Sequence, residues 1–277
     1  MDLRIVNTCN NDCLYCLEGS LRKKEKFIST QKIFQKISEE TNKDNIAFFW
    51  GNPLLHPDFL KIVEFSKSQG FDSIWFLTNG FWISHTFLEK FKQNWWTTIW
   101  FYFHSFDEEN HDVITGKSGN YWNFLNNLKL ISASWLNSRC IIHINNGNIP
   151  NIAKDVLLIF WNYKIDNFDF VNYFPFDKPY INRKYLDYSI EINGDKIDLL
   201  FKVLLKTKVT VNFMKFPKDF FWKYQMFYNF EKWVISQIWD EDYERLDTDT
   251  EPFCYEEKRC NSCFIKDHCK FYKKIKT

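Results

Sequence analysis

Short apolar runs and helix-patterned segments alternate along residues 3–175 of this 277-residue chain. The apolar runs, such as residues 45–49, have the length and composition of buried parallel strands. The segments between them carry apolar residues at helical spacing, as with Ile33, Phe34 and Ile37. Six such alternations predict a parallel sheet with right-handed crossovers. A doubly wound sheet and an incomplete (β/α) barrel both give this pattern.

Polar or small residues follow the apolar runs, at the places where ligands bind in barrels. These residues are Cys9, Gly51, Asn79, Ser105 and Asn145. In a (β/α) barrel the carboxyl ends of the strands surround one mouth, which holds the active site. The recurrence therefore favours an α/β fold: a partial (β/α)6 TIM-type barrel over residues 1–178, followed by a Cys-rich C-terminal extension over residues 179–277.

Some boundaries follow from local pattern alone. A polar loop is expected between the strand that ends at Phe103 and a helix over Tyr121–Ser132. In the extension, Ile190–Asp195 is interpreted as a strand and turn, Lys196–Leu205 as a helix and Val209–Phe213 as a strand.

Three cysteines stand directly after the first apolar run, with the spacing C-x3-C-x2-C: Cys9, Cys13 and Cys16. One loop can wrap these thiolates around a single metal centre. Three ligands are one fewer than a closed zinc site or a fully ligated iron–sulfur cluster needs. An iron–sulfur cubane held in this way keeps one iron open for a substrate or cofactor. The plainer interpretation is a reduced structural thiol cluster or half of a zinc knuckle.

A second group of cysteines lies near the end of the printed sequence, with the spacing C-x5-C-x2-C-x5-C: Cys254, Cys260, Cys263 and Cys269. Four ligands suit either a closed structural zinc site or a fully ligated [4Fe–4S] cluster. The remaining cysteine, Cys140, stands alone in an apolar run and is predicted to be a small buried hydrophobe. His143 in the same run is expected to be a hydrogen-bonded residue of the barrel.

Charge and composition exclude some classes of function. The chain carries 36 Lys and Arg against 35 Asp and Glu, so its net charge of +1 gives no case for a general nucleic-acid surface. No apolar stretch approaches the ~20 residues of a membrane span, and the N-terminus lacks a signal-peptide pattern. Clustered thiols without such a signal indicate a reducing compartment, so we expect a cytoplasmic protein with no membrane partner.

Two motifs in register resemble the radical S-adenosylmethionine (radical SAM) family. Residues 9–16 match its cluster loop C-x3-C-x-aromatic-C, with Tyr15 at the aromatic place. Residues 49–57, Phe-Trp-Gly-Asn-Pro-Leu-Leu-His-Pro, resemble the family's turn G-G-E-P-L-L-H-P, which receives the methionyl amine of the cofactor. This chain departs from that turn twice: Trp50 replaces the first Gly, and Asn52 replaces the Glu. The amide oxygen of Asn52 can still accept a hydrogen bond.

Weaker similarity continues along the chain. Thr78-Asn79-Gly80 resembles the family's T-N-G turn, and Ser105 begins a stretch similar to S-x-D…H-D-x-[IL]-[RT]-G. The resemblance implies that the cluster loop holds the catalytic [4Fe–4S] cluster. It also implies a set of S-adenosylmethionine contacts: Tyr15, Trp50, Gly51, Asn52, Asn79, Ser105 and Asn145. His104 and His111 are interpreted as cap or loop hydrogen-bonding residues.

The resemblance also implies a reaction. An electron from the reduced cluster cleaves S-adenosylmethionine, and the 5′-deoxyadenosyl radical abstracts a hydrogen atom from the substrate. An electron donor such as flavodoxin or ferredoxin is then required. The tail cysteines resemble the SPASM and twitch extensions of radical SAM maturases, so a peptide or protein substrate is expected. Two alternatives stay open: modification of a nucleoside or RNA, and a non-catalytic zinc- or iron–sulfur-binding protein on a degenerate barrel.

The balance of Gly and Trp is unusual. The chain has only 8 Gly but 12 Trp, and together they reach the share, about 7%, that Gly alone has in average proteins. Several Trp residues fall where a chain favours Gly: Trp135 and Trp161 follow helical stretches, and Trp95-Trp96 join a helix to a strand. One hypothesis is that UGA codons, read as glycine by the organism, are printed as Trp. The alternative is a protein rich in Trp.

Overall fold

The computed structural model describes most of the chain up to residue 214. The described ranges are 1–16, 27–92, 97–172, 182–186 and 190–214, with the single residues 216, 221, 224 and 226. Two sets of residues singled out in the sequence lie outside them: Trp95-Trp96 and the tail cysteines Cys254, Cys260, Cys263 and Cys269.

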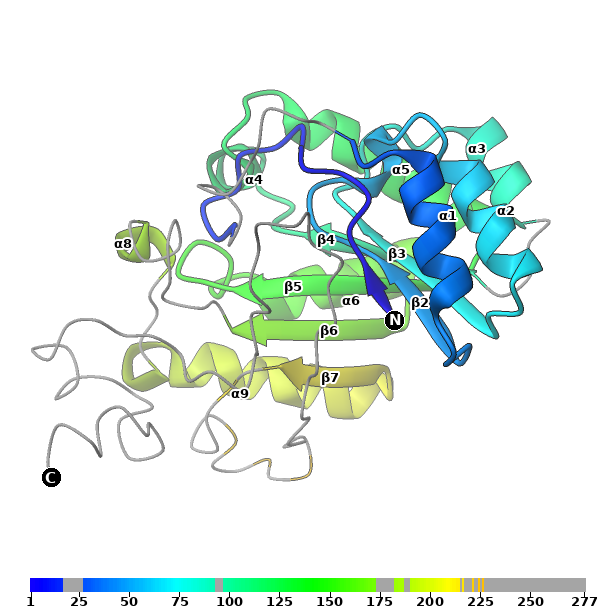
Figure 1. The fold of residues 1–277 in the computed structure, drawn as a ribbon. Coiled ribbons are helices and arrows are strands. Elements are labelled where there is room, and N and C mark those ends of the chain that lie inside the picture. Colours follow the sequence, from blue (N-terminus) through cyan, green and yellow to red (C-terminus); the bar gives the residue numbers. More distant parts are fainter. Residues whose placement is uncertain are drawn as a thin grey trace, which may run out of the picture.

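Seven parallel strands form one sheet, in the order in which they occur in the chain (Figure 1). Their bounds are β1 Asp2–Leu3, β2 Asn45–Phe48, β3 Ser73–Thr78, β4 Thr97–Phe103, β5 Ser138–Ile144, β6 Asn167–Asn172 and β7 Thr210–Met214. Each strand pairs only with its neighbours in this order, so the described sheet is not closed between β1 and β7. The predicted α/β fold with an incomplete barrel is therefore confirmed.

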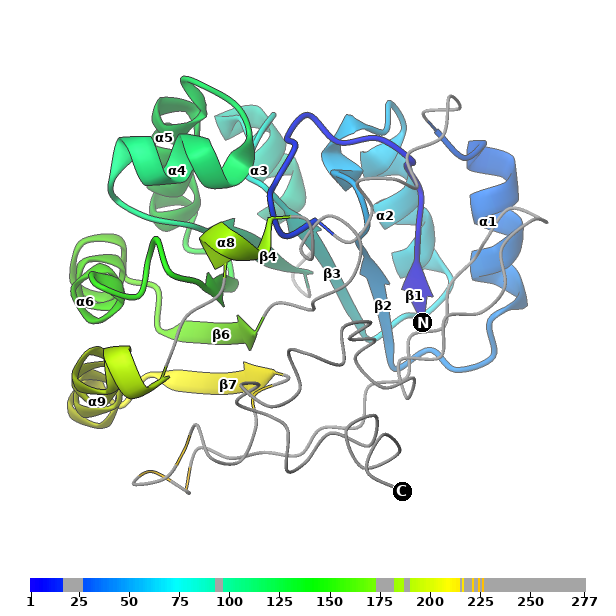
Figure 2. The same ribbon diagram turned by 90° about the vertical axis from the view of Figure 1, so that its left-hand side faces the viewer.

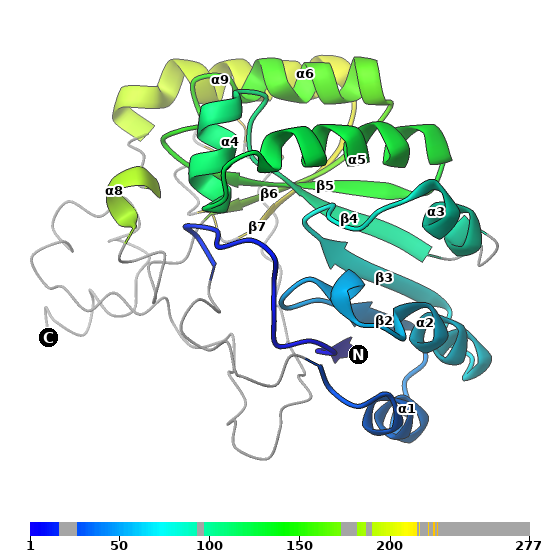
Figure 3. The same ribbon diagram turned by 90° about the horizontal axis from the view of Figure 1, so that it is seen from above.

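The helices lie on the outer face of the curved sheet (Figure 2). Their bounds are α1 Thr30–Glu39, the 3-10 turn η1 Pro53–Leu55, α2 Phe59–Ser68, α3 His85–Lys92, α4 Glu108–Thr115, α5 Asn120–Ser134, α6 Ile152–Tyr163, α8 Arg183–Leu186 and α9 Ile190–Thr207. Short α4 and α8 stand instead near the carboxyl ends of the strands, beside the N-terminal loop (Figures 1 and 3). In the described part of the chain, no helix combines the length and the apolar character that crossing a bilayer requires.

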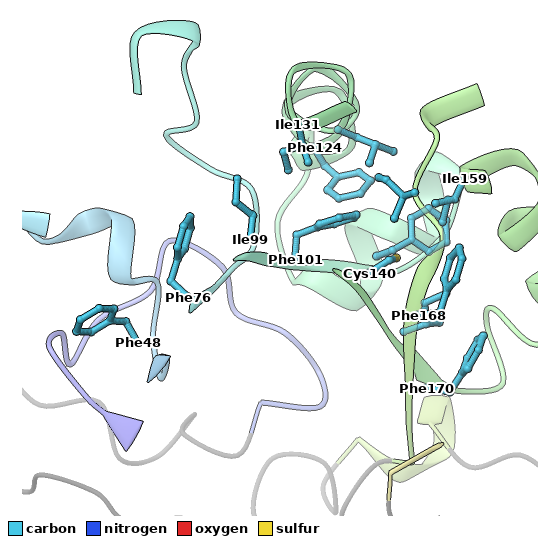
Figure 4. Packing of buried hydrophobic residues seen from close by; sticks show 14 of the residues in the cluster. Phe48, Phe76, Ile99, Phe101, Phe124, Ile131, Cys140, Ile159, Phe168 and Phe170 are labelled. Atoms are coloured by element: carbon cyan, nitrogen blue, oxygen red, sulfur yellow. The ribbon is translucent and has the colours of Figure 1, made fainter. Parts of the chain in front are cut away.

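The core fills the space between the sheet and the outer helices (Figure 4). Phe48, Phe76, Phe101 and Phe168 project from four strands into this layer and are completely buried. Burying one such ring stabilises the fold by about 2 kcal/mol. The closely packed layer fixes the strands, and with them the loops that follow their carboxyl ends.

The inner face of the sheet is more exposed than the core face. In β3, for example, Ile74 and Phe76 are buried, whereas Trp75 is partly exposed on the other face. Trp75 stacks on Trp100 of β4 with their ring centroids 4.2 Å apart. The alternation of apolar and partly exposed residues follows from the two-residue period of a strand. It leaves the inner face of the open barrel available for other contacts.

The expectation of a strand and turn over Ile190–Asp195 is wrong, because α9 begins at Ile190 and runs without a break to Thr207. Its most deeply buried residues share one face at helical spacing: Ile197, Leu200, Phe201 and Leu204. This face packs near α6 (Figure 3). Tertiary burial therefore overrides the turn signal of Asn193-Gly194, although Gly within a helix costs about 1 kcal/mol.

The strand predicted over Val209–Phe213 is β7, at residues Thr210–Met214. It pairs in parallel with β6 and so adds a seventh strand to the predicted six. The sheet thus continues past residue 178, and the division of the chain into two domains stays a prediction.

Candidate functional site

The loop that carries Cys9, Cys13 and Cys16 lies at the carboxyl end of the sheet, next to the turn after β2. The amide N–H of Asn52 donates to the carbonyl oxygen of Thr8, 3.1 Å away. Gly51 has a φ of +64°, and a Cβ placed on it would lie 2.3 Å from the same oxygen. Only glycine permits this close approach, so Gly51 fixes the start of the cysteine loop.

Helix α4 holds the other side of the cysteine loop. The N–H groups of Asp12 and Leu14 donate to the carbonyl oxygens of Thr115 and Ile114, each at 2.9 Å. At the end of α4, Gly116 adopts a left-handed conformation, and a Cβ on it would lie 2.5 Å from the carbonyl oxygen of Asp12. The loop is therefore held between two glycine contacts, on Gly51 and on Gly116.

The sequence interpretation placed a polar loop where α4 stands, and this expectation is wrong. Asp107 caps the helix by accepting from the N–H of Asn110 at 2.8 Å, and Glu108 and Glu109 occupy the first turn. Together with Gly116 at the end, these residues are the usual signals of a short helix. These signals in the sequence could have predicted α4.

Four polar side chains form a hydrogen-bonded network beside Cys9. The hydroxyl of Thr78 donates to Oδ1 of Asn52 at 2.9 Å. Nδ2 of Asn52 donates to Oδ1 of both Asn10 (3.0 Å) and Asn79 (3.1 Å). Nδ2 of Asn79 in turn lies 3.0 Å from Oδ1 of Asn10 and 3.6 Å from Sγ of Cys9. Among the described residues, the Asn52 oxygen thus uses one of its two acceptor positions.

The three thiols are reduced and partly exposed. Burial, with the charges of Cys16, Cys13 and Cys9 added to it, raises the pKa of the neighbouring Tyr102 phenol. All three sulfurs therefore lie near enough to the Tyr102 phenol to disfavour its ionisation. As they stand, no three Cys, His, Asp or Glu side chains of the described residues converge closely enough to hold a metal ion.

The chemistry of the donor set fits an iron–sulfur cluster. Soft thiolates are the ligands that such clusters take, and all three come from one short loop that the fold holds at both sides. An amide N–H already points at one of the sulfurs.

Tyr15 of the loop packs on buried rings of the inner wall. Its ring stacks on His143 at 4.0 Å between centroids and contacts Tyr102 at 5.8 Å. Its hydroxyl lies 3.4 Å from both ring nitrogens of His104. Burial lowers the pKa of His143 to about 3 and that of His104 well below its usual value. Both imidazoles are therefore neutral near pH 7.

Other expectations for single residues have mixed outcomes. Cys140 is completely buried in β5, as predicted, and burial raises the pKa of its thiol. His143 differs, because its Nδ1 is buried without a hydrogen-bond partner among the described residues. His111 is not a cap: it is buried within α4, with its ring centroid 5.0 Å from that of Phe124.

Ser105 and Asn145 also lie after strands, but their side chains serve their own turns. The Ser105 hydroxyl accepts from the N–H of Asp107 at 2.9 Å. Oδ1 of Asn145 accepts from the N–H of Gly147 at 2.9 Å, and its Nδ2 donates to the carbonyl oxygen of His143. The fold thus brings Gly51, Asn52 and Asn79 to the cysteine loop, and it buries Ser105 and Asn145 in neighbouring turns.

Comparison with known proteins identifies similar sequences and folds. The sequence model of the family described as "Radical SAM superfamily" matches residues 3–155, more than half of the chain. No curated protein matches the chain at a significant level.

Several solved structures share the fold. SuiB of Streptococcus suis bound to S-adenosylmethionine is 15% identical with a TM-score of 0.62, over 81% of this chain and 52% of that one. Native anSMEcpe with bound AdoMet is 17% identical with a TM-score of 0.61, over 76% of this chain and 63% of that one. HydG, a maturase of the [FeFe]-hydrogenase, is 12% identical with a TM-score of 0.60, over 79% and 52%. The chain spans about half the length of SuiB and HydG.

Proposed function

This chain belongs to the radical SAM superfamily, a family of enzymes, and we propose that it cleaves S-adenosylmethionine reductively at a [4Fe–4S] cluster held by Cys9, Cys13 and Cys16. Such a cluster would pass one electron to S-adenosylmethionine, whose cleavage would release methionine and supply a 5′-deoxyadenosyl radical to take a hydrogen atom from the substrate. The observation that carries the proposal is the three-cysteine loop, held between Gly51 and α4 at the mouth of the open barrel.

The chain's own residues have distinct tasks in this proposal. The three thiolates hold the cluster and leave one coordination position for the cofactor. Gly51 lets the backbone of the loop and that of the β2 turn approach each other closely. Tyr15, buried against His143, places the aromatic ring of the motif beneath the loop. The proposed cofactor contacts also include position 50, Asn52, Asn79, Ser105 and Asn145.

A peptide or protein is the proposed substrate. Structures of similar fold include SuiB bound to its precursor peptide SuiA and anSMEcpe with bound AdoMet and the Cp18Cys peptide. These ligands are those of the named proteins, and they support the same substrate class here. The balanced net charge of +1 gives no comparable support for an RNA substrate.

The remaining parts of the proposal rest on the sequence. The tail cysteines hold an auxiliary [4Fe–4S] cluster or a structural zinc, as their spacing suggests. A flavodoxin or ferredoxin supplies the electron. Clustered reduced thiols fit the reducing environment of the cytoplasm.

A second candidate is a non-catalytic metal-binding protein on a degenerate barrel. It is favoured by one observation, the indole of Trp50 at the place where the family's turn has glycine. The identity of the natural residue at position 50 therefore bears on the choice between the two functions.

Anaerobic reconstitution of the full chain with iron and sulfide tests the function. We expect a reducible cluster, seen by electron paramagnetic resonance, and formation of 5′-deoxyadenosine from S-adenosylmethionine in the presence of a reductant. Cys13→Ala should abolish both. Cys140→Ala, which alters a buried cysteine away from the loop, should retain both. 5′-Deoxyadenosine formation by reconstituted Cys13→Ala would refute the assignment of the cluster ligands.

A further inference from the structure

Three tryptophans of the described chain have a left-handed backbone conformation. The φ angle is 73° at Trp50, 70° at Trp82 and 57° at Trp135. Seven tryptophans lie in the described residues, where Lys164 and Lys208 are the other non-glycine residues with positive φ. Positive φ is found for only a few per cent of non-glycine residues and is an outlier for bulky side chains. Three of the five described non-glycine residues with positive φ are tryptophan, and this concentration in one residue type needs an explanation.

Trp82 and Trp135 gain nothing from burial that would offset this conformation. Trp135 is the left-handed C-cap of α5, with ψ at 19°, a position at which glycine is the usual residue. Its side chain is 83% exposed, and that of Trp82 is 65% exposed. Both positions have the backbone of glycine and a large apolar ring in solvent.

Trp50 shows the same conflict inside the protein. It precedes Gly51, so two successive residues are left-handed, with φ values of 73° and 64°. Its indole Nε1 is buried and has no hydrogen-bond partner among the described residues. A buried indole normally satisfies this donor, and an unsatisfied one carries its full desolvation cost. A residue without a side chain removes both the strain and the unpaired donor.

We propose that the natural protein carries glycine at positions 50, 82 and 135, because the organism reads the UGA codons of this gene as glycine. The backbone makes no such demand at the other described tryptophans, which lie in strands or helices: Trp75, Trp100, Trp122 and Trp161. Trp161 in particular lies inside α6 and not after its end, since α6 extends to Tyr163 and Lys164 is its left-handed cap.

The proposal has a consequence for the site, which rests on the proposed function. With glycine at 50, the turn after β2 reads Gly-Gly-Asn-Pro and no indole occupies the mouth beside Arg4, whose guanidinium carbon now lies 5.5 Å from the indole ring. The observation that favours a non-catalytic protein then disappears.

Peptide mass spectrometry of the protein purified from its own organism is the direct test. We expect the peptides that contain positions 50, 82 and 135 to have the masses given by glycine. Tryptophan at any of the three positions would overturn the proposal. This result is independent of catalysis: glycine at all three positions without cleavage of S-adenosylmethionine would refute the proposed function alone.

Recombinant protein made from a synthetic gene with UGG codons, which carries tryptophan at all of these positions, gives a second test. Trp82→Gly and Trp135→Gly should each raise the melting temperature, because glycine adopts positive φ without strain. Trp161→Gly is the matched control: its side chain is 61% exposed but stands within a helix, so glycine there should lower the melting temperature. A similar fall for all three variants would show that the left-handed positions accept tryptophan, and would overturn the structural argument.

The amide network at the mouth carries a separate inference, because its hydrogen bonds have a fixed direction. The N–H of Gly80 donates to Oγ1 of Thr78 at 3.1 Å, so the Thr78 hydroxyl is left to donate to Asn52. Oδ1 of Asn79 accepts from Nδ2 of Asn52 and from the N–H of Phe81, each at 3.1 Å. The amide nitrogen of Asn79 must therefore face Sγ of Cys9.

We infer that Asn79 is a positioning residue that raises the reduction potential of a cluster bound through Cys9. Hydrogen bonds to ligand sulfurs stabilise the extra negative charge of the reduced cluster. The inference rests on the proposed function. It makes Asn79 a determinant of how easily the cluster accepts an electron, a property separate from any contact with S-adenosylmethionine.

Redox titration of the reconstituted full chain, followed by electron paramagnetic resonance without S-adenosylmethionine, tests this role. Asn79→Leu and Asn79→Ser, which both remove the amide donor, should shift the midpoint potential to more negative values. Asn137→Ala is the matched control, since Asn137 bonds to Thr98 at the opposite ends of the strands and should leave the potential unchanged. An unchanged potential in either Asn79 variant would overturn the inference. Failure of the parent chain to assemble a cluster would instead refute the proposed function.

Discussion

At the carboxyl ends of the strands the inner wall presents neutral amides, whereas toward the amino ends it is built around an ion pair. Near the mouth, Asn52 and Asn79 bond to each other and to the cysteine loop. Deeper in the barrel, Nη1 of Arg139 lies 3.0 Å from Oδ1 of Asp169, and the guanidinium lies over the ring of Trp100 at 5.2 Å. The inner wall thus carries hydrogen-bonded amides at its carboxyl end and an ion pair at its amino end.

The difference between the two ends of the wall bears on how the site can accept a charged ligand. The ion pair at the base satisfies its own groups, because Asp169 is buried and also accepts from Nδ2 of Asn212 at 2.9 Å. Amides at the mouth orient hydrogen bonds without bringing a fixed charge. A charged cluster or cofactor that binds beside these amides has no carboxylate–cation pair of theirs to separate, and the nearby Nζ of Lys117 donates to the carbonyl oxygen of Asn10 in the cysteine loop at 3.3 Å.

The largest effect is expected from breaking the ion pair at the base. Asp169→Ala should lower the free energy of unfolding by about 4 kcal/mol, because it leaves the Arg139 guanidinium uncompensated in a largely buried place. Urea unfolding followed by circular dichroism measures the change. Asn212→Ala removes one hydrogen bond to the same carboxylate and should cost only about 1 kcal/mol. Equal losses of unfolding free energy in the two variants would mean that the ion pair contributes no more to stability than the single hydrogen bond from Asn212.

At the mouth, the contact under the cysteine loop should be the most sensitive. Gly51→Ala should cost about 3 kcal/mol, since it combines left-handed strain with a Cβ that collides with the Thr8 carbonyl. Gly70→Ala is the control: Gly70 has a φ of +86° but nothing within 4 Å of its Cβ position, so about 1 kcal/mol of strain is expected. Denaturant unfolding of both variants measures the difference, and equal values would contradict a tight contact at Gly51.

The contact on α4 should be weaker, because a Cβ on Gly116 would lie 2.5 Å from the carbonyl oxygen that it meets, against 2.3 Å for Gly51. The three atoms nearest to a Cβ on Gly116 all belong to Asp12 of the cysteine loop. Gly116→Ala should therefore cost about 2 kcal/mol, against about 1 kcal/mol for Gly119→Ala, whose Cβ position is open. The same unfolding measurement compares them. A larger loss for Gly119→Ala would mean that α4 does not hold the loop.

The pattern of apolar runs predicted the strands and outer helices up to residue 172 because each run has one dominant period. It failed where the pattern was short or mixed. Helix α4 is eight residues long and polar at its start. It holds the cysteine loop through hydrogen bonds to Asp12 and Leu14, which lie about a hundred positions earlier in the chain. Contacts of that kind leave no periodic trace in the sequence.

For the site, the sequence predicted part of the group of residues that gather but not how they bond. It also expected Ser105 and Asn145 there, and their side chains bond within their own turns. Cys9, Gly51 and Asn79 follow successive strands of a parallel sheet, so their proximity follows from topology. The direction of the amide hydrogen bonds depends on the backbone N–H groups of Gly80 and Phe81, which only the folded turn places. Likewise, the count of Trp suggested glycine, but the φ angles identify the positions that require it.

The smallest expected effect concerns the protonation of a buried histidine in α4. Burial lowers the pKa of His111 in α4 to about 4, from a usual value of 6.5. Below pH 6.5 the unfolded chain binds a proton that the folded chain excludes, so stability falls as the pH falls toward 4. Between pH 7 and pH 5.5 this residue should account for about 1 kcal/mol of the loss. His111→Phe, which keeps an aromatic ring against Phe124, should make the fall in unfolding free energy between pH 7 and pH 5.5 smaller by that amount. If the variant shows the same pH dependence of unfolding free energy as the parent chain, the pKa of His111 is not lowered in the folded protein.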